Sequence, residues 1–382
     1  MKNWDAIVIG AGIIGLSLAL ELHKQGLRVL VVEKGEPGRE ASWAAGGMLC
    51  DFSPEMPPEL RELATASAAM YPEFVRELED ESGLKIDLRS VGTLVLLDKS
   101  QGPHALDAHG LDGHGLDRHG LDGHGLNDDG WPAHWRELEP NLQAANLRAK
   151  GCVGHYLKER CVDPRDLTAA AIAAARRHRS IDFASGDQVL AVEVTNGKAC
   201  GVRTNKTQFA AGIVVNCAGA WAGQIGPHAF PTRPVKGQML CVIMPEKEMV
   251  RHVVRTVGLP QDVYLIPRSD GRMTIGATAE EAGFDKQTVP ETIQKLRQAA
   301  IDLVPKLADA RILEAWAGLR PGTPDKLPIL GATPMSGYFV ATGHFRDGIL
   351  LAPVTAKVMG RIITGTSPQI DLSEFSASRF AA

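Results

Sequence analysis

DAIVIGAGIIG, residues 5–15, is the stretch that decides the fold. Asp5 to Ile9 is a short run of strand-forming residues, and Ile13 to Gln25 then carries apolar side chains at helical spacing until Gly26 ends the pattern. Leu27 to Val32 predicts a second buried strand. Strand, glycine turn, helix and strand in this order form a βαβ unit, which is the building block of a parallel sheet.

The GxGxxG pattern of residues 10–15 is typical of a turn that binds a dinucleotide. Gly10 permits the tight turn, Gly12 lets the backbone approach a pyrophosphate, and Gly15 allows the helix to pack closely on the strand. The helix N-terminus attracts the phosphates, and Glu33 is placed to bind a ribose but would repel the 2′-phosphate of NADP. NAD and FAD both remain open at this point. The first predicted cofactor contacts are Gly10, Gly12, Ile13, Ile14, Gly15 and Glu33.

The composition favours a globular protein whose partner is a small molecule. The 382 residues suit one large or two interleaved domains, and a net charge of -4 argues against binding to nucleic acid or anionic lipid. The apolar run from Ala6 to Leu20 is interrupted by glycines, so we expect neither a signal peptide nor a membrane segment. The six cysteines are scattered without a CxxC pair, which predicts reduced thiols and a cytoplasmic protein.

An internal repeat occupies residues 104–128, with the units HALDA, HGLDG, HGLDR, HGLDG and HGLND. Each unit has one leucine, and glycine replaces strong helix or strand formers, so the repeat cannot bury enough apolar surface to order itself. We predict a surface insertion. Its histidines and aspartates could hold a transition metal only loosely, and no metal site is assigned.

The remaining pattern predicts an α/β protein with a discontinuous, Rossmann-like cofactor domain and an inserted α+β domain. Nucleotide-type elements stand at both ends of the chain, around a middle that is rich in antiparallel-looking strands. The inserted domain, built on an antiparallel sheet, is expected to bind the substrate. The predicted cofactor domain comprises 1–84, 151–226 and 316–382, and the predicted substrate domain comprises 85–150 and 227–315.

Two further segments favour FAD over NAD. Ile213 to Trp221 is a buried strand that ends in small residues, as needed where backbone passes close to a cofactor. Ala341 to Ile349 is a strand and a glycine-bounded turn that leads into a helix, and the positive helix end could stabilise the negative charge of a reduced flavin. A core strand and a simple turn are the structural alternatives.

With these segments, the chain resembles the D-amino-acid oxidase superfamily of flavoproteins, and within it the bacterial glycine oxidases linked to thiazole synthesis. The likeness covers nearly the whole chain apart from the histidine-rich repeat. The motifs that carry it are GAGIIG (10–15) with Glu33, AAGGML (44–49), NCAGAW (216–221), YLIPR (264–268), GAT (276–278), WAGLRPGT (316–323) and GHFRDGILLAP (343–353).

The resemblance implies FAD as the cofactor and a site for a small amino acid. Arg320 would hold the substrate carboxylate bidentately, Tyr264 would add a phenolic hydrogen bond, and Arg346 and Met48 would lie close to the same pocket. Ala279 stands where glycine oxidases can carry methionine, so glycine, sarcosine and somewhat larger D-amino acids all remain open. Further implied cofactor contacts are Lys34, Arg39, Ser42, Ala45, Gly46, Gly47, Met48, Val189, Ala218, Gly219, Trp221, Gly343, His344, Phe345, Arg346, Asp347, Gly348 and Ile349.

The implied reaction is transfer of hydride from the amino acid Cα to flavin N5. The imine product would hydrolyse to a 2-oxo acid and ammonia or supply thiazole synthesis, and O2 would reoxidise the flavin to give H2O2. No residue is assigned as a general base, and His344 is a weak candidate. Covalent flavin attachment is not expected, because no cysteine lies in the Gly343 to Pro353 segment, and a homo-oligomer is expected by analogy. The alternatives are a dehydrogenase that passes electrons to a quinone or a partner protein, an NAD-dependent dehydrogenase, and a non-catalytic nucleotide-binding module.

Overall fold

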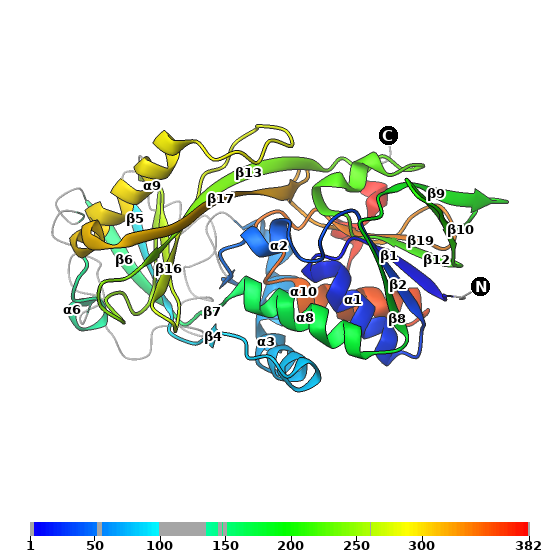
Figure 1. Cartoon of the computed structure of the whole chain (residues 1–382), viewed down its shortest axis with the longest axis horizontal. Coiled ribbons are helices and arrows are strands. Elements are labelled where there is room, and N and C mark those ends of the chain that lie inside the picture. Colours follow the sequence, from blue (N-terminus) through cyan, green and yellow to red (C-terminus); the bar gives the residue numbers. More distant parts are fainter. Residues whose placement is uncertain are drawn as a thin grey trace.

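The computed structural model describes residues 4–51, 56–98, 135–143, 147, 151–259 and 261–380. These residues form two lobes that lie side by side along the longest axis of the molecule (Figure 1). One lobe is built on a largely parallel sheet and the other on a largely antiparallel sheet. The predicted repeat at 104–128 lies outside the described residues.

The sheet of the cofactor lobe has six strands in the order β18-β19-β12-β1-β2-β8. Every neighbouring pair in it is parallel except β18 with β19. Buried apolar side chains dominate its central strands, as expected for a parallel sheet covered on both faces. The bounds are β1 (Ala6–Ile9), β2 (Val29–Glu33), β8 (Ile181–Ser185), β12 (Ile213–Asn216), β18 (Ile329–Ala332) and β19 (Tyr338–Thr342).

Different layers cover the two faces of this sheet because side chains alternate along each strand. Ala6 and Val8 pack into a core with a layer of helices, whereas Ile7 and Ile9 pack toward a small three-stranded sheet. The helices are α1 (Ile13–Lys24), α3 (Arg61–Ser82), α8 (Pro164–Arg177) and α10 (Ala352–Ile363), and the small sheet comprises β9 (Val189–Thr195), β10 (Lys198–Thr204) and β11 (Gln208–Ala210) (Figure 1).

The sheet of the substrate lobe has seven strands in the order β17-β13-β16-β15-β14-β5-β6. Its neighbours are antiparallel except β14 with β5, and α9 (Pro290–Leu303) packs against β13 and β16. The strands are β5 (Thr93–Asp98), β6 (Cys152–Leu157), β13 (Arg233–Ile243), β14 (Val253–Val257), β15 (Tyr264–Pro267), β16 (Arg272–Gly276) and β17 (Arg311–Gly322).

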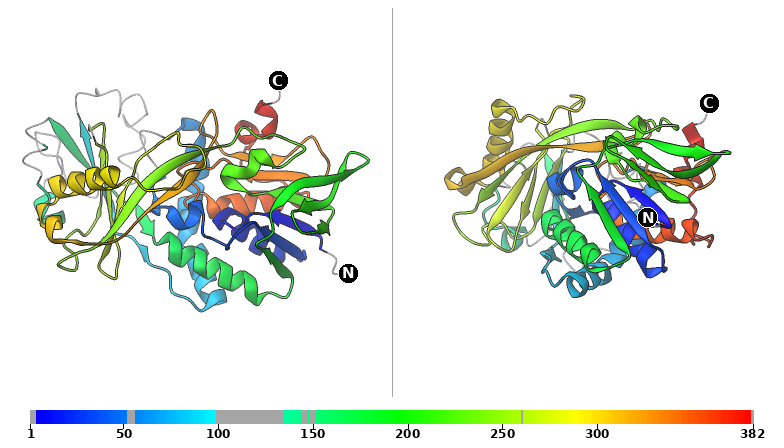
Figure 2. Two further views of the ribbon diagram at one scale, coloured as in Figure 1. Left: turned by 45° about the horizontal axis from the view of Figure 1, so that its top comes forward. Right: turned by 45° about the vertical axis from the view of Figure 1, so that its right-hand side comes forward.

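Strands β13 and β17 connect the two lobes. The two strands are paired along their length, from Arg233 with Gly322 to Ile243 with Arg311, with one register shift between Cys241 and Val242. Both strands run across the molecule in all views (Figures 1 and 2). The shorter elements near the junction are α2 (Ala41–Ala44), β3 (Met48–Leu49), β4 (Leu88–Arg89) and β7 (Arg160–Val162), and α6 (Trp135–Leu138) lies in the substrate lobe.

The predicted fold class is confirmed, with a Rossmann-like lobe and an antiparallel lobe. Strand β6 lies just beyond the boundary expected at 151 and β17 crosses the boundary expected at 316, yet both strands pair within the seven-stranded sheet. None of the six cysteines forms a disulfide. Within the described residues, no helix has the length and apolar character needed to cross a membrane.

Candidate active site

A cavity of about 1030 Å³ lies between the lobes. Loops at the carboxyl ends of β1, β2, β12 and β19 line one end, and the face of the seven-stranded sheet lines the other. Open α/β sheets bind ligands at the carboxyl ends of their strands, so the first end is suited to a cofactor. At the second end, side chains of the substrate lobe reach the same cavity.

The glycine turn has the geometry that its sequence predicts. Gly10 has φ 103°, and a Cβ atom there would lie 2.6 Å from the carbonyl oxygen of Cys217. A Cβ atom on Gly15 would lie 2.0 Å from the carbonyl oxygen of Gly10. Gly12 begins α1 with no side-chain cap, which leaves the helix end accessible to a ligand. Any larger residue would fill the cradle that a pyrophosphate needs.

Glu33 and Ser42 hold this turn in place. The Glu33 carboxylate accepts hydrogen bonds from the backbone N–H of Ala11 at 2.8 Å and of Gly35 at 3.0 Å, and Ser42 Oγ accepts one from Ile13 N–H at 2.9 Å. Glu33 is buried at the cavity wall. These residues therefore fit the adenosine and pyrophosphate of FAD, since a fixed turn, a helix N-terminus and an acidic strand terminus converge.

Lys34, Trp221 and Phe284 stack on one another beside the turn. Lys34 Nζ lies 3.0 Å from the centroid of the Trp221 ring, and Phe284 stacks on the same ring with centroids 5.1 Å apart. Burial lowers the pKa of Lys34. Phe284 comes from the substrate lobe, so this stack joins the two lobes at the edge of the cavity.

Arg320 and Tyr264 lie together at the substrate end. Arg320 Nη1 donates a hydrogen bond to the Thr278 carbonyl at 2.9 Å, and the guanidinium lies over Gly237, where an added Cβ would be 2.4 Å from Nη1. Burial raises the pKa of Tyr264, and the positive charges of Arg320 and Arg346 partly oppose this effect. Tyr264 therefore remains a neutral hydrogen-bond donor near a guanidinium, which suits a carboxylate ligand.

His344 is poorly suited to act as a general base. It is buried, its Nε2 lies 3.1 Å from Thr355 Oγ1, and burial lowers its pKa to about 3. A side chain with such a low pKa takes up a proton only weakly at neutral pH. Arg346, two residues further along the same loop, is exposed at the cavity wall.

The cavity collects nearly all of the residues predicted from the sequence, and all but Gly15, Arg39 and Gly343 line it. Gly15 does not reach the cavity but packs directly against the backbone of Gly10 in the turn. Arg39 is exposed, pairs with Glu36 at 3.4 Å and lies over the Trp43 ring. Gly237, Met239, Arg255, Thr278 and Gly318 also line the cavity, although the sequence did not identify them as site residues. A glycine inside a predicted strand often marks a close approach, so Gly237 and Gly318 carried a usable signal.

Comparisons with known proteins agree with this geometry. A model of the family "FAD dependent oxidoreductase" (DAO) matches residues 5–362. The glycine oxidase of Pseudomonas aeruginosa is 33% identical over 97% of each chain. The bifunctional protein ThiO/ThiG of Trichormus variabilis is 34% identical over 98% of this chain, which spans about half of that relative (55%). The crystal structure of glycine oxidase from Geobacillus kaustophilus has a TM-score of 0.88 and 30% identity, with all of both chains covered.

The chain therefore belongs to the DAO family of FAD-dependent oxidoreductases. The predicted cofactor and the predicted resemblance to glycine oxidases are confirmed. Two similar relatives, from Pseudomonas aeruginosa and Geobacillus kaustophilus, are named glycine oxidases, and the match covers 97% of each of them.

Proposed function

We propose that this protein is an FAD-dependent oxidase of glycine and similarly small amino acids, including sarcosine and small D-amino acids. The observation that carries the proposal is the position of Arg320 and Tyr264 in the same cavity as the glycine turn. Bound FAD supplies a two-electron acceptor for the Cα–H bond of the substrate. Arg320 binds the carboxylate, and Tyr264 donates to it.

The residues of the cavity mainly orient the substrate and exclude water. Because Arg320 is held by the Thr278 carbonyl, its guanidinium is preorganised before a substrate arrives. No described residue has the position and pKa of an evident general base, and burial disqualifies His344. The substrate amine therefore binds in its neutral form, and the imine product hydrolyses in water or passes to thiazole synthesis.

The test is a peroxide assay on the yellow, FAD-loaded protein with glycine, sarcosine and D-alanine. The expected result is H2O2 in equal amounts with the imine. Arg320→Leu should raise the KM for glycine about 10- to 150-fold, because a hydrogen-bonded charge contributes about 1.5–3 kcal/mol, and should leave the flavin spectrum unchanged. Arg311→Leu, at an exposed arginine on the same strand β17 that is not part of the cavity lining, is a matched control with an expected wild-type KM. An unchanged KM in Arg320→Leu would exclude its carboxylate role.

The alternatives give different outcomes in the same assay. Flavin reduction by glycine without peroxide would identify a dehydrogenase that uses a quinone or a partner protein. A yellow protein that no amino acid reduces would indicate a non-catalytic nucleotide-binding module. Use of O2, a cytoplasmic location and a homo-oligomeric state remain part of the proposal, and size-exclusion chromatography tests the last.

A further inference from the structure

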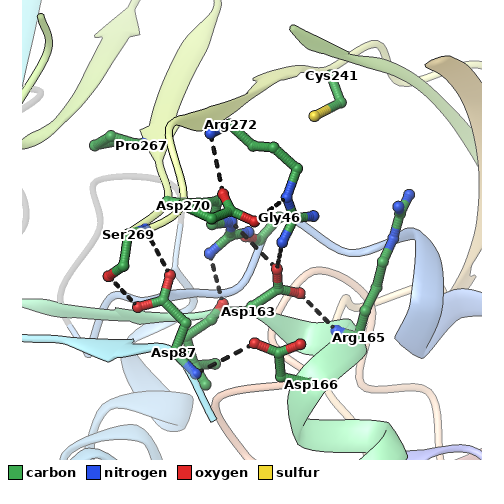
Figure 3. A network of polar contacts seen from close by, with 12 residues as sticks. Gly46, Asp87, Asp163, Arg165, Asp166, Cys241, Pro267, Ser269, Asp270 and Arg272 are labelled. Atoms are coloured by element: carbon green, nitrogen blue, oxygen red, sulfur yellow. Dashed lines mark hydrogen bonds and ion pairs between the residues drawn. The ribbon is translucent and has the colours of Figure 1, made fainter. Parts of the chain in front are cut away.

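A buried polar network holds the two lobes together beside the cavity (Figure 3). Its centre is Arg268, which directly follows β15 and is only 4% exposed. Arg268 Nη1 donates to the Val162 carbonyl at 2.8 Å, and Nη2 donates to the Gly46 carbonyl at 2.5 Å. One guanidinium thus bonds the backbone of β7 and of the Gly46–Gly47 loop, although it belongs to the substrate lobe.

The charge of Arg268 is compensated from the cofactor lobe. Asp163, which caps α8 by accepting from Arg165 N–H, lies 3.9 Å from Arg268 and accepts from Arg272 at 3.0 Å. The turn between β15 and β16 is further tied down because Ser269 donates twice to Asp87. A buried ion that is paired and fully hydrogen-bonded favours one arrangement of its neighbours.

The loop that Arg268 holds faces Tyr264 directly. A Cβ atom added to Gly46 would lie 3.3 Å from Tyr264 Cε2 and 3.5 Å from its hydroxyl oxygen. Gly46, Gly47 and Tyr264 all line the cavity. Tyr264 and Arg268 are the two ends of one short segment, since β15 spans Tyr264–Pro267. Arg268 therefore links the strand that carries Tyr264 to the Gly46–Gly47 loop, through its hydrogen bond to the Gly46 carbonyl.

We propose that Arg268 is a positioning residue, which fixes the distance between the substrate-binding wall and the cofactor-binding loop through its hydrogen bond to Gly46. This inference rests on the proposed function. Substrate binding depends on Arg320 and Tyr264, which both belong to the seven-stranded sheet and keep their mutual geometry without Arg268. Loss of Arg268 consequently affects the rate of flavin reduction more than the affinity for a carboxylate.

The test compares Arg268→Met and Arg268→Lys with Arg89→Gln as a matched control. Arg89 donates to the Pro267 carbonyl at 2.8 Å, on the same turn, and has no hydrogen bond to Gly46. For each FAD-loaded protein we would measure the visible flavin spectrum, the rate of anaerobic reduction at saturating glycine, the Kd of acetate from the spectral change that it causes, and the melting temperature.

The expected result for Arg268→Met is a 10- to 100-fold slower reduction, because a misplacement of about 1 Å can lower a rate about 100-fold. Its flavin bands should shift, while the acetate Kd changes less than 3-fold. Arg268→Lys, which can still bond one carbonyl, should recover part of the rate, and Arg89→Gln should reduce at the wild-type rate.

A wild-type rate and spectrum in Arg268→Met would overturn the inference. So would an acetate Kd that weakens in proportion to the rate, or an equal loss in Arg89→Gln, since both would indicate a general structural role. If Arg268→Met does not fold, the same comparisons apply to Arg268→Lys. Failure of the proposed function is distinct, because the wild-type protein itself would then show no reduction by any amino acid.

Discussion

Gly237→Ala should impair substrate binding without harming the fold. The new methyl group would lie 2.4 Å from Arg320 Nη1 and 2.6 Å from Nη2. Carbon and nitrogen atoms in contact are ordinarily about 3.5 Å apart, so the guanidinium must move by roughly 1 Å. That movement also breaks the hydrogen bond from Arg320 to the Thr278 carbonyl. Because the obstructed group is the end of a flexible side chain, the backbone of β13 need not shift.

The expected magnitude follows from these distances. A carboxylate ligand misplaced by about 1 Å should lose about 10- to 100-fold in kcat/KM. Stability should stay within about 1 kcal/mol of wild type or rise slightly, because alanine restricts the unfolded chain more than glycine does. Gly237 does not have a positive φ, so alanine meets no backbone strain there.

The assay is steady-state oxidation of glycine, with thermal unfolding and the FAD content measured on the same samples. Gly212→Ala is the matched control, since its Cβ would meet no heavy atom within 4 Å. A wild-type kcat/KM for glycine in Gly237→Ala would show that the methyl group does not displace Arg320. A loss of FAD or a large drop in melting temperature would equally contradict the prediction, because the effect would then arise in the fold.

Two other predictions concern the cofactor turn and pH. Glu33→Gln removes an acceptor for Ala11 N–H or Gly35 N–H and should raise the Kd for FAD at least 10-fold, measured by fluorescence titration of the apoprotein, whereas the exposed Glu36→Gln should not. The folded pKa of His344 is about 3, below its usual 6.5, so the unfolded chain takes up the proton first and stability is lost as pH falls from 6.5 toward 3. His344→Gln should reduce the loss between pH 7 and 5 by about 2 kcal/mol in urea unfolding; equal losses would contradict burial of the imidazole.

Local patterns made the cofactor turn predictable. The glycines at 10–15 and the apolar spacing of α1 lie within one short segment, so the sequence alone predicts both the turn and the helix that follows it. β8 could not be predicted in the same way. It is a short edge strand that hydrogen-bonds to β2, far away in the sequence, so nothing in its immediate neighbourhood indicates the pairing.

β17 shows why the substrate end was harder to predict. Its residues include Gly318 and Pro321, which disfavour an isolated strand, and only the eleven-residue partner β13 makes the pairing favourable. The family resemblance identified Arg320, but the sequence could not show that its guanidinium lies over Gly237. Arg39 follows a cofactor motif, yet the chain turns its side chain toward Glu36 and the solvent. Such orientations depend on tertiary packing.

The two strands shared by both lobes bear on how this protein could be re-engineered. Since β13 and β17 are single, continuous elements, neither lobe is a module that can be exchanged at a linker (Figure 2). A chimera with crossover points inside 233–243 or 311–322 would sever the ladder and leave exposed edges that invite aggregation. A chimera designed to change the substrate specificity should therefore take β13 and β17 complete from one parent protein, with the crossover points in the loops beyond them.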